Sequence, residues 1–161
     1  MFSGIELFNL KGKRVLITGS SQGIGFALAK GLSSAGADIV LNGRDKAKLE
    51  NSAKDLNSEN GLFQLSFDVT NQKEVKQKID EFEKNFGPIE ILINNAGMQY
   101  RTPLEDFPSE MFEKLLHTNI SSVFNVSQVV AKHMIKRGHG KIINIASVQT
   151  LLARPGIAPY T

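Results

Sequence analysis

The chain has 161 residues, of which 41% are hydrophobic and 22% charged, and its formal net charge is +3 at pH 7. This composition is that of an ordinary globular protein, and the length suits one domain with a sizeable core. The absence of cysteine excludes disulfides, thiolate zinc sites and cysteine nucleophiles, and it fits a reducing compartment.

The chain shows no signal for a membrane or for export. No apolar run approaches the roughly 18 residues that a membrane-spanning helix needs. Residues 1–10 lack both the basic start and the long apolar core of a secretion signal. We therefore expect a cytoplasmic protein with no membrane partner. Because no linker or repeat divides the sequence, residues 1–161 are expected to form one domain.

Short apolar runs alternate with longer amphipathic runs along the whole chain. In chain order, strands are expected near 13–18, 37–42, 62–67, 89–94 and 141–146. The intervening helices are expected near 23–35, 45–58, 71–86 and 109–137, with Asp45 and Asn71 as N-caps. Apolar runs such as Ile39-Val40-Leu41 suit strands that are covered on both faces. The alternation therefore predicts an α/β fold, a doubly wound parallel sheet in the order 3-2-1-4-5.

The first expected strand leads into a glycine-rich turn that opens a helix. The turn is Gly19-Ser20-Ser21-Gln22-Gly23-Ile24-Gly25. Bare backbone N–H groups and the positive end of a helix dipole attract phosphate at such a turn, and glycine allows a pyrophosphate to approach closely. No Lys-Ser/Thr pair follows, which disfavours an NTPase loop. The turn predicts a dinucleotide site, and a plain glycine-rich turn is the alternative interpretation.

Polar or glycine-bearing residues also follow each of the remaining four expected strands. They are Asn42-Gly43-Arg44, Asp68-Val69, Asn94-Asn95-Ala96-Gly97 and Ala146-Ser147. Ligands of parallel sheets bind beyond the carboxyl ends of the strands. We therefore expect these residues to lie along one edge of the sheet and to face one crevice.

The end of the second expected strand bears on the choice of nucleotide. A carboxylate there would bind a free ribose 2′-hydroxyl and repel a 2′-phosphate, whereas an arginine would pair with the phosphate. Arg44 lies 19 positions beyond Gly25, and its competitor Asp45 stands where a helix N-cap is expected. We therefore favour NADP(H) as the cofactor, with NAD(H) as the alternative.

Basic residues gather between positions 132 and 141. They are Lys132, His133, Lys136, Arg137, His139 and Lys141. A nucleic-acid surface is one interpretation, but cations also complement the carboxyl end of a helix, and no aromatic side chains are interleaved with these. We favour the helix end and expect no nucleic-acid partner.

The order and spacing of these motifs match a known family. The chain resembles the short-chain dehydrogenase/reductase family at Thr18-Gly19-x-x-x-Gly23-x-Gly25, Asp68-Val69, Asn94-Asn95-Ala96-Gly97, Asn119, Ser147 and Tyr160. The resemblance covers nearly the whole chain. It implies a Rossmann-type domain and hydride transfer between a nicotinamide and a secondary alcohol or ketone.

The resemblance also implies three catalytic residues. Tyr160 would exchange a proton with the substrate oxygen, and Ser147 would hydrogen-bond that oxygen as charge develops on it. Asn119, inside the long fourth helix, would hold a water that relays protons. Taken singly, each residue has a structural alternative: a half-buried aromatic, a turn serine and an asparagine satisfied within its helix.

Further implied roles concern the adenosine half of the cofactor. Asp68, beside Val69, would accept a hydrogen bond from the adenine amino group, and an acid at a helix N-terminus is the alternative. Asn95, Ala96 and Gly97 would leave backbone room for the ribose. Asn94 would instead tie its strand to the neighbouring strand.

Within the family, two regions are most similar to gluconate 5-dehydrogenases. They comprise residues 95–101 with 103–105, and residues 147–149 with 153–161. The implied substrate is a sugar acid, gluconate with its 5-keto form. Its carboxylate needs a cation, for which Arg101 and Arg154 are the candidates, and Gln99 and Gln149 could bind its hydroxyls. Solvated surface arginines are the alternative.

The chain departs from the family pattern after Tyr160. The family tyrosine belongs to Tyr-x-x-x-Lys, and the lysine expected four places beyond Tyr160 falls past Thr161. That lysine would favour the phenolate and hold the nicotinamide ribose. The family's further strands would also cover residues 141–145, which otherwise form a sheet edge. We therefore expect a domain that is incomplete at its carboxyl end.

Three functional classes remain open from the sequence. The first is an NADP(H)-dependent oxidoreductase acting on a sugar acid. The second is a nucleotide-binding module without turnover, and the third is a reductase of 3-oxoacyl chains bound to a carrier protein. The context of Arg101 and Arg154 leans away from the third. We also expect a homo-oligomer, with the helix near 109–137 as its interface.

Overall fold

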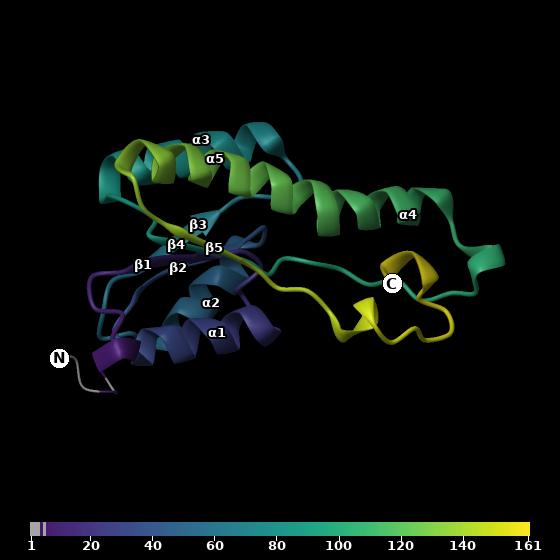
Figure 1. Ribbon diagram of the computed structural model, residues 1–161, viewed down its shortest axis with the longest axis horizontal. Helices are drawn as coiled ribbons and strands as arrows, with labels where there is room; N and C mark the ends of the chain where they lie inside the picture. Colours follow the sequence, from purple (N-terminus) through teal and green to yellow (C-terminus); the bar gives the residue numbers. More distant parts are fainter. Residues whose placement is uncertain (1–3, 5) are drawn as a thin grey trace.

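The computed structural model describes residues 4 and 6–161 and shows one parallel sheet between two layers of helices (Figure 1). Residues 1–3 and 5, part of the segment considered as a secretion signal, lie outside the described residues. Within the described part of the chain, no helix is both long enough and apolar enough to cross a membrane.

The sheet has the strand order that the sequence predicts. Its strands are β1 (Arg14–Ile17), β2 (Asp38–Gly43), β3 (Leu62–Ser66), β4 (Ile91–Asn94) and β5 (Lys141–Asn144). They are all parallel and follow the order β3-β2-β1-β4-β5, which confirms the predicted doubly wound topology. In the register, Val15 of central β1 lies opposite Ile39 and Ile91.

Helices cover both faces of the sheet. On one face lie α1 (Gly23–Ser34) and α2 (Lys46–Leu56), and on the other α3 (Gln72–Phe86) and α5 (Ser122–Arg137) (Figure 1). Two of these helices begin at the predicted N-caps: Asp45 accepts a hydrogen bond from the Lys48 N–H, and Asn71 accepts one from the Glu74 N–H.

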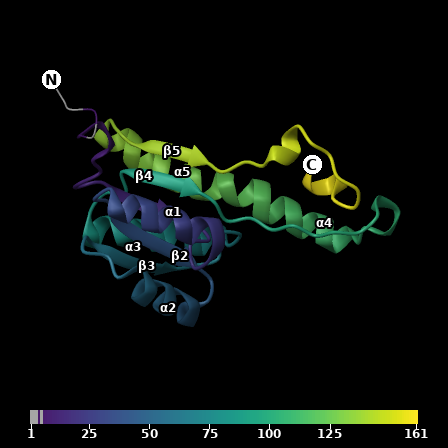
Figure 2. The ribbon, with the colours of Figure 1, turned by 90° about the horizontal axis from the view of Figure 1, so that it is seen from below.

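The fourth predicted helix is not uniform. It consists of α4 (Ser109–Leu116), a π-helical turn η3 (His117–Ser121) and α5. A π turn holds one extra residue against the α-helical period, so the hydrophobic pattern of the sequence does not reveal it. We call this continuous helix, residues 109–137, the helix rod. Its α4 end extends past the carboxyl ends of the strands (Figures 1 and 2).

Short 3₁₀ helices occupy loops in which the sequence predicts no element. They are η1 (Glu6–Phe8), η2 (Leu104–Asp106), η4 (Val148–Thr150) and η5 (Ala158–Tyr160). The last two follow β5, and η5 lies beside α4 (Figure 2). The segment after β5 therefore lies beyond the carboxyl ends of the strands, alongside the α4 end of the rod (Figures 1 and 2).

Alternate side chains of the strands form a core on each side of the sheet. Leu16, Val40 and Leu92 pack toward α3 and α5 and are fully buried. Val15, Ile17 and Ile39 belong to a second buried cluster on the α1 and α2 side. Because successive strand residues point to opposite faces, the same short apolar run supplies both cores.

Strand β5 lies at the edge of the sheet, and its residues are exposed. Asn94 fixes it to β4, since its Nδ2 donates to Asn144 Oδ1 at 2.8 Å and to Ser127 Oγ at 2.8 Å. The prediction that Asn94 ties its strand to the neighbouring strand is therefore confirmed.

Carboxylates pair with several members of the basic segment at the end of α5. His133 Nε2 lies 2.7 Å from Asp80 Oδ1, Arg137 Nη1 lies 3.0 Å from Glu83 Oε2, and His139 Nδ1 lies 3.1 Å from Glu90 Oε2. Hydrogen bonds from Lys76 and then from His133 lower the pKa of Asp80, against the opposing effect of partial burial. These basic side chains thus join α5 and the turn after it to α3 and to the residue before β4.

Candidate functional site

The ends of β1 and β4 are joined by a network around Thr18 and Asn95, which we call the β1–β4 clasp. Thr18 Oγ1 accepts hydrogen bonds from the N–H groups of Asn95 and Ala96, both at 3.0 Å. In return, Asn95 Nδ2 donates to the carbonyls of Thr18 at 3.0 Å and Gly19 at 3.2 Å. Thr18 is buried, so the clasp fixes two strand ends without solvent competition.

Glycine is required where the clasp meets the turn. Gly19 has φ +62°, and a Cβ there would lie 2.9 Å from Ala96 Cα. A Cβ on Gly25 would lie 2.5 Å from Asn95 Nδ2 and 2.6 Å from the Gly19 carbonyl oxygen. Both glycines therefore let the turn pack against the end of β4. Gly25 serves this packing and does not line the cavity described below.

The N-terminal end of α1 is open. Its N-cap Gln22 makes no side-chain hydrogen bond to the helix, and its first turn carries no acidic residue. Gly23 has φ +60°, and a Cβ there would meet nothing within 4 Å. Free N–H groups, a positive dipole end and open space beside them fit the phosphates of a dinucleotide.

Asn42 and Ser20 fix the turn from beneath. Asn42 Oδ1 accepts from the Gly19 N–H at 3.3 Å, and its Nδ2 donates to the Leu65 and Phe67 carbonyls at 2.9 and 3.2 Å. Ser20 Oγ donates to the Ile17 carbonyl at 2.8 Å and accepts from the Asn42 N–H at 2.9 Å. Ser20 is fully buried and does not line the cavity, so it acts on the backbone of the turn.

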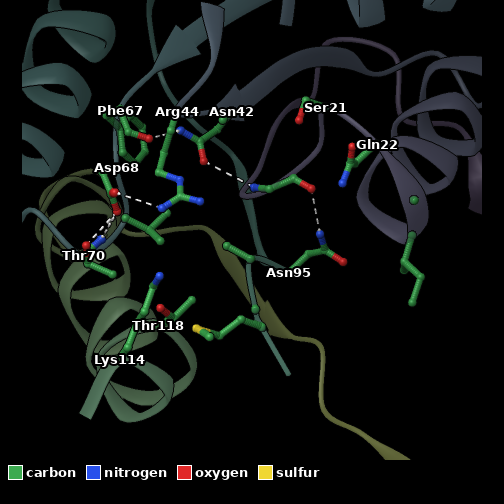
Figure 3. A pocket seen from close by; sticks show the side chains of 18 residues that line it. Ser21, Gln22, Asn42, Arg44, Phe67, Asp68, Thr70, Asn95, Lys114 and Thr118 are labelled. Carbon is green, nitrogen blue, oxygen red and sulfur yellow. Dashed lines mark hydrogen bonds and ion pairs between the residues drawn. The ribbon is translucent and has the colours of Figure 1, made fainter. Parts of the chain in front are cut away.

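A cavity of about 500 Å³ lies over these strand ends (Figure 3). This volume is within the range of small-molecule sites. The residues proposed from sequence that line it are Gly19, Ser21, Gln22, Gly23, Ile24, Arg44, Asp68, Val69, Asn95, Ala96 and Gly97. Asn42 and Gly43, which are expected at this edge of the sheet, also line it. Five further lining residues were not assigned from the sequence: Phe67, Thr70, Met98, Lys114 and Thr118.

The two carboxylate oxygens of Asp68 have different partners. Its Oδ1 accepts from the Thr70 N–H at 2.9 Å and from Thr70 Oγ1 at 2.7 Å, which orders the turn before α3. Its Oδ2 lies 3.5 Å from Arg44 Nη1 across the cavity. Partial burial by itself raises the pKa of Asp68, but the Thr70 hydrogen bonds and the Arg44 charge outweigh it and lower this pKa.

A second cavity of about 420 Å³ adjoins the first. Both are lined by Ile24, Asn95, Ala96, Gly97 and Met98, so they share a wall. Ser147, Tyr160, Asn119 and Gln99 line only the second. The glycine-rich turn of β1 and the two hydroxyl side chains beyond β5 thus face adjoining parts of one crevice.

The two hydroxyl-bearing residues come from the segment after β5. Ser147 is the N-cap of η4, and its Oγ accepts a hydrogen bond from the Gln149 N–H at 3.2 Å. Tyr160 ends η5 and is half-buried. A short cap and a 3₁₀ turn therefore hold both side chains at the second cavity.

Asn119 lies in the π-helical turn, and its side chain is engaged by the backbone of Met98. Asn119 Oδ1 accepts from the Met98 N–H at 2.8 Å, and Nδ2 donates to the Met98 carbonyl at 2.9 Å. This pair of bonds holds the loop after β4 against the helix rod. A π turn at such a position is frequent at functional sites.

The four proposed substrate residues are placed differently from one another. Gln99 lines the second cavity, and Arg101 Nε donates to Gln99 Oε1 at 3.4 Å. Arg101 and Arg154 are exposed, on loops that the Thr102 N–H to Gly156 carbonyl bond of 3.0 Å joins. Gln149 is buried, and within the described residues its Oε1 has no hydrogen-bond partner. Of the four, Gln99 is the one that lines either of the two cavities described above.

Two of the unassigned lining residues share a signal that the sequence contains. Lys114 and Thr118 are four residues apart and lie one helical turn from each other, which puts them on one face. Asn119 follows directly. The spacing of these residues predicts that they share a helix face. That this face lies close to the ends of β2 and β3 depends on tertiary packing.

Comparisons with known proteins show which family the chain matches. A family model described as short chain dehydrogenase matches residues 13–161. The chain is 52% identical over 158 residues to the gluconate 5-dehydrogenase of Gluconobacter oxydans (strain 621H), covering 97% of this chain and 61% of that protein. It is 43% identical over 157 residues to the 5-keto-D-gluconate 5-reductase of Escherichia coli (strain K12), covering 96% of this chain and 61% of the relative.

A solved structure is similar over the same region. A gluconate 5-dehydrogenase from Burkholderia cenocepacia J2315, in complex with NADP and tartrate, matches with a TM-score of 0.93 and 50% identity. The match covers 98% of this chain and 62% of that one. The chain thus spans about three fifths of the length of the relatives it matches.

The close packing at Gly19 predicts a specific cost for a side chain there. Gly19→Ala should lower the free energy of unfolding by about 2 kcal/mol or more, because alanine at positive φ is strained and its Cβ meets Ala96. Gly31→Ala is the matched control: its Cβ would meet nothing within 4 Å, and it lies inside α1, so it should stabilise by about 0.5–1 kcal/mol. Urea denaturation measures both, and equal effects would contradict the packing argument.

Proposed function

The chain belongs to the short-chain dehydrogenase family, and on that premise we propose that the protein carrying it is an NADP(H)-dependent oxidoreductase. It interconverts a secondary alcohol and a ketone on a sugar acid, and the substrate pair is gluconate and 5-ketogluconate. The names of the two similar enzymes support this substrate, and the similar structure with NADP and tartrate, a hydroxylated acid, supports both ligands.

One observation carries the proposal: the shared wall of the two cavities. It brings the open end of α1 within the same crevice as Ser147 and Tyr160. A dinucleotide that lies with its phosphates on α1 and runs along Asn95, Ala96 and Gly97 reaches those hydroxyls with its far end. The second cavity then has room for a small substrate beside it.

Each residue has a defined part in this scheme. The nicotinamide, when bound, supplies the acceptor or donor of a hydride. The N–H groups at the start of α1 bind the diphosphate, and Arg44 pairs with the 2′-phosphate. The Tyr160 hydroxyl gives or takes the proton of the substrate oxygen, and the Ser147 hydroxyl stabilises charge on that oxygen. Asn119 positions the Met98 loop, which forms part of the wall between the cavities.

The substrate carboxylate is assigned to the exposed arginines near the second cavity. Arg101 is linked to Gln99, which lines that cavity, and the loop of Arg154 is joined to the loop of Arg101. A guanidinium can bind a carboxylate with two parallel hydrogen bonds, and it keeps its charge at any physiological pH. The bound acid would thus be held with its alcohol carbon toward Tyr160.

The proton-transfer role predicts a loss of turnover with intact binding. Tyr160→Phe should lower the rate of NADPH oxidation by 5-ketogluconate by about 10²- to 10⁴-fold, because the proton donor is removed while the ring remains. The assay follows NADPH absorbance in the whole protein that carries residues 1–161, with NADPH binding measured separately by fluorescence. Binding without any wild-type turnover would favour the nucleotide-binding module instead. Turnover of a 3-oxoacyl thioester in place of 5-ketogluconate would favour the carrier-protein reductase.

The nucleotide assignment predicts a reversal of preference at one position. Arg44→Asp should weaken NADPH binding and strengthen NADH binding relative to it, because a carboxylate there repels a 2′-phosphate and accepts the 2′-hydroxyl. Fluorescence titration of both nucleotides gives the ratio of dissociation constants. Arg101→Ala is the control, since it should raise the Michaelis constant for gluconate and leave that ratio alone. An unchanged ratio in Arg44→Asp would refute the role of Arg44.

The protein is also proposed to form a homo-oligomer through the α4–α5 rod. Phe112, Ile120 and Phe124 on this rod are 40%, 64% and 60% exposed. Large apolar side chains gathered on one exposed element favour burial against another molecule. Phe124→Glu should therefore shift the sedimentation coefficient toward that of a monomer, whereas Leu151→Glu, which alters a 90% exposed side chain elsewhere, should leave it unchanged. Sedimentation of the wild type as a monomer would end this proposal.

A further inference from the structure

Within the described residues, three charged side chains line the nucleotide cavity. Arg44 comes from the loop after β2, Asp68 from the loop after β3 and Lys114 from α4. Figure 3 shows all three reaching into the same space. The roles proposed above use Arg44 and Asp68 and leave Lys114 without one.

Asp68 and a bound 2′-phosphate would compete for the guanidinium of Arg44. The guanidinium that is to bind a 2′-phosphate lies 3.5 Å from the Asp68 carboxylate. Asp68 is ionised at neutral pH, because its hydrogen bonds with Thr70 and the charge of Arg44 hold its pKa below the usual value. An arriving phosphate therefore competes with Asp68 for Arg44, and it also meets a like charge close by.

Lys114 brings a second positive charge to the cavity in which this competition takes place. In Figure 3 its side chain points into the cavity from the side opposite Arg44, and Asp68 and Thr70 line the same cavity. Thr118, one helical turn later, lines the same cavity, so this face of α4 is turned to the nucleotide site.

The lysine has an alternative partner that it does not use. Glu110 stands four residues before Lys114 on α4, which is the favourable arrangement for an ion pair along a helix. Nevertheless, within the part of the chain that the structure describes, Lys114 makes no ion pair with any carboxylate. Its charge is thus available to the cavity.

We propose that Lys114 is a specificity-determining residue for the 2′-phosphorylated nucleotide, because its ammonium offsets the Asp68 carboxylate and releases Arg44 to the phosphate. This inference rests on the NADP(H) dependence proposed above. With NAD(H), Arg44 can stay on Asp68, and Lys114 contributes little. The lysine therefore acts on the difference between the two nucleotides more than on binding in general.

The test is a double-mutant cycle of nucleotide binding. Lys114→Gln should weaken NADPH binding about fivefold and change NADH binding less than about twofold, as measured by fluorescence titration of the protein. In an Asp68→Asn background, the same substitution should change NADPH binding less than about twofold, because the carboxylate to be offset is gone. Asparagine at position 68 keeps an oxygen for the Thr70 hydrogen bonds.

Matched variants separate this role from a general effect of charge. Lys132→Gln removes the same charge from α5, outside the residues that line either cavity, and should leave both affinities unchanged. Lys114→Arg should retain the preference for NADPH. Equal weakening of NADPH and NADH by Lys114→Gln, or the same NADPH loss in the Asp68→Asn background, would overturn the inference, as would no effect at all.

The outcomes also distinguish this inference from the proposed function. If the wild-type protein binds neither nucleotide, the proposed function fails, and the role of Lys114 fails with it. If it binds NADPH more tightly than NADH and Lys114→Gln changes nothing, only the role of Lys114 is lost.

Discussion

The β1–β4 clasp is the constraint on which the rest of the site depends. Thr18 and Asn95 exchange side-chain and backbone hydrogen bonds across two parallel strand ends, and Gly19 packs its bare Cα region against Ala96. Once this contact is fixed, α1 must begin at the edge of the crevice with its N–H groups facing into it. The same contact aligns Asn95, Ala96 and Gly97 as the wall between the two cavities.

A second connection extends the site beyond the sheet. Asn119 binds both backbone groups of Met98, and this places the loop after β4 against the π turn of the helix rod. The rod in turn carries Lys114 and Thr118 to the nucleotide cavity. Beyond β5, the segment that contains η4 and η5 carries Ser147 and Tyr160 to the adjoining cavity. Substrate-side and nucleotide-side elements therefore depend on one shared wall.

Few charged side chains lie at the carboxyl ends of the strands. The nucleotide cavity has an open helix end, two cations and one carboxylate among its described lining residues. A single arginine beside a carboxylate would be largely neutralised, so the selectivity expected of Arg44 depends on what surrounds Asp68. At the carboxyl end of α5, by contrast, His133, Arg137 and His139 pair with carboxylates of α3 and of Glu90, just before β4, and so hold these elements together.

The sequence by itself determined the order of elements, the strand order, the caps at Asp45 and Asn71 and most of the nucleotide cavity. These follow from local signals: period, turn glycines and the rule that strand ends share an edge. Only the tertiary structure decided that Ser20 and Gly25 support the turn without lining the cavity, that the helix rod contains a π turn, and that Lys114 lines the same cavity as Asp68. The reason is physical: strand period and turn chemistry act between neighbours in the chain, whereas the facing of α4 is set by contacts between segments far apart in sequence.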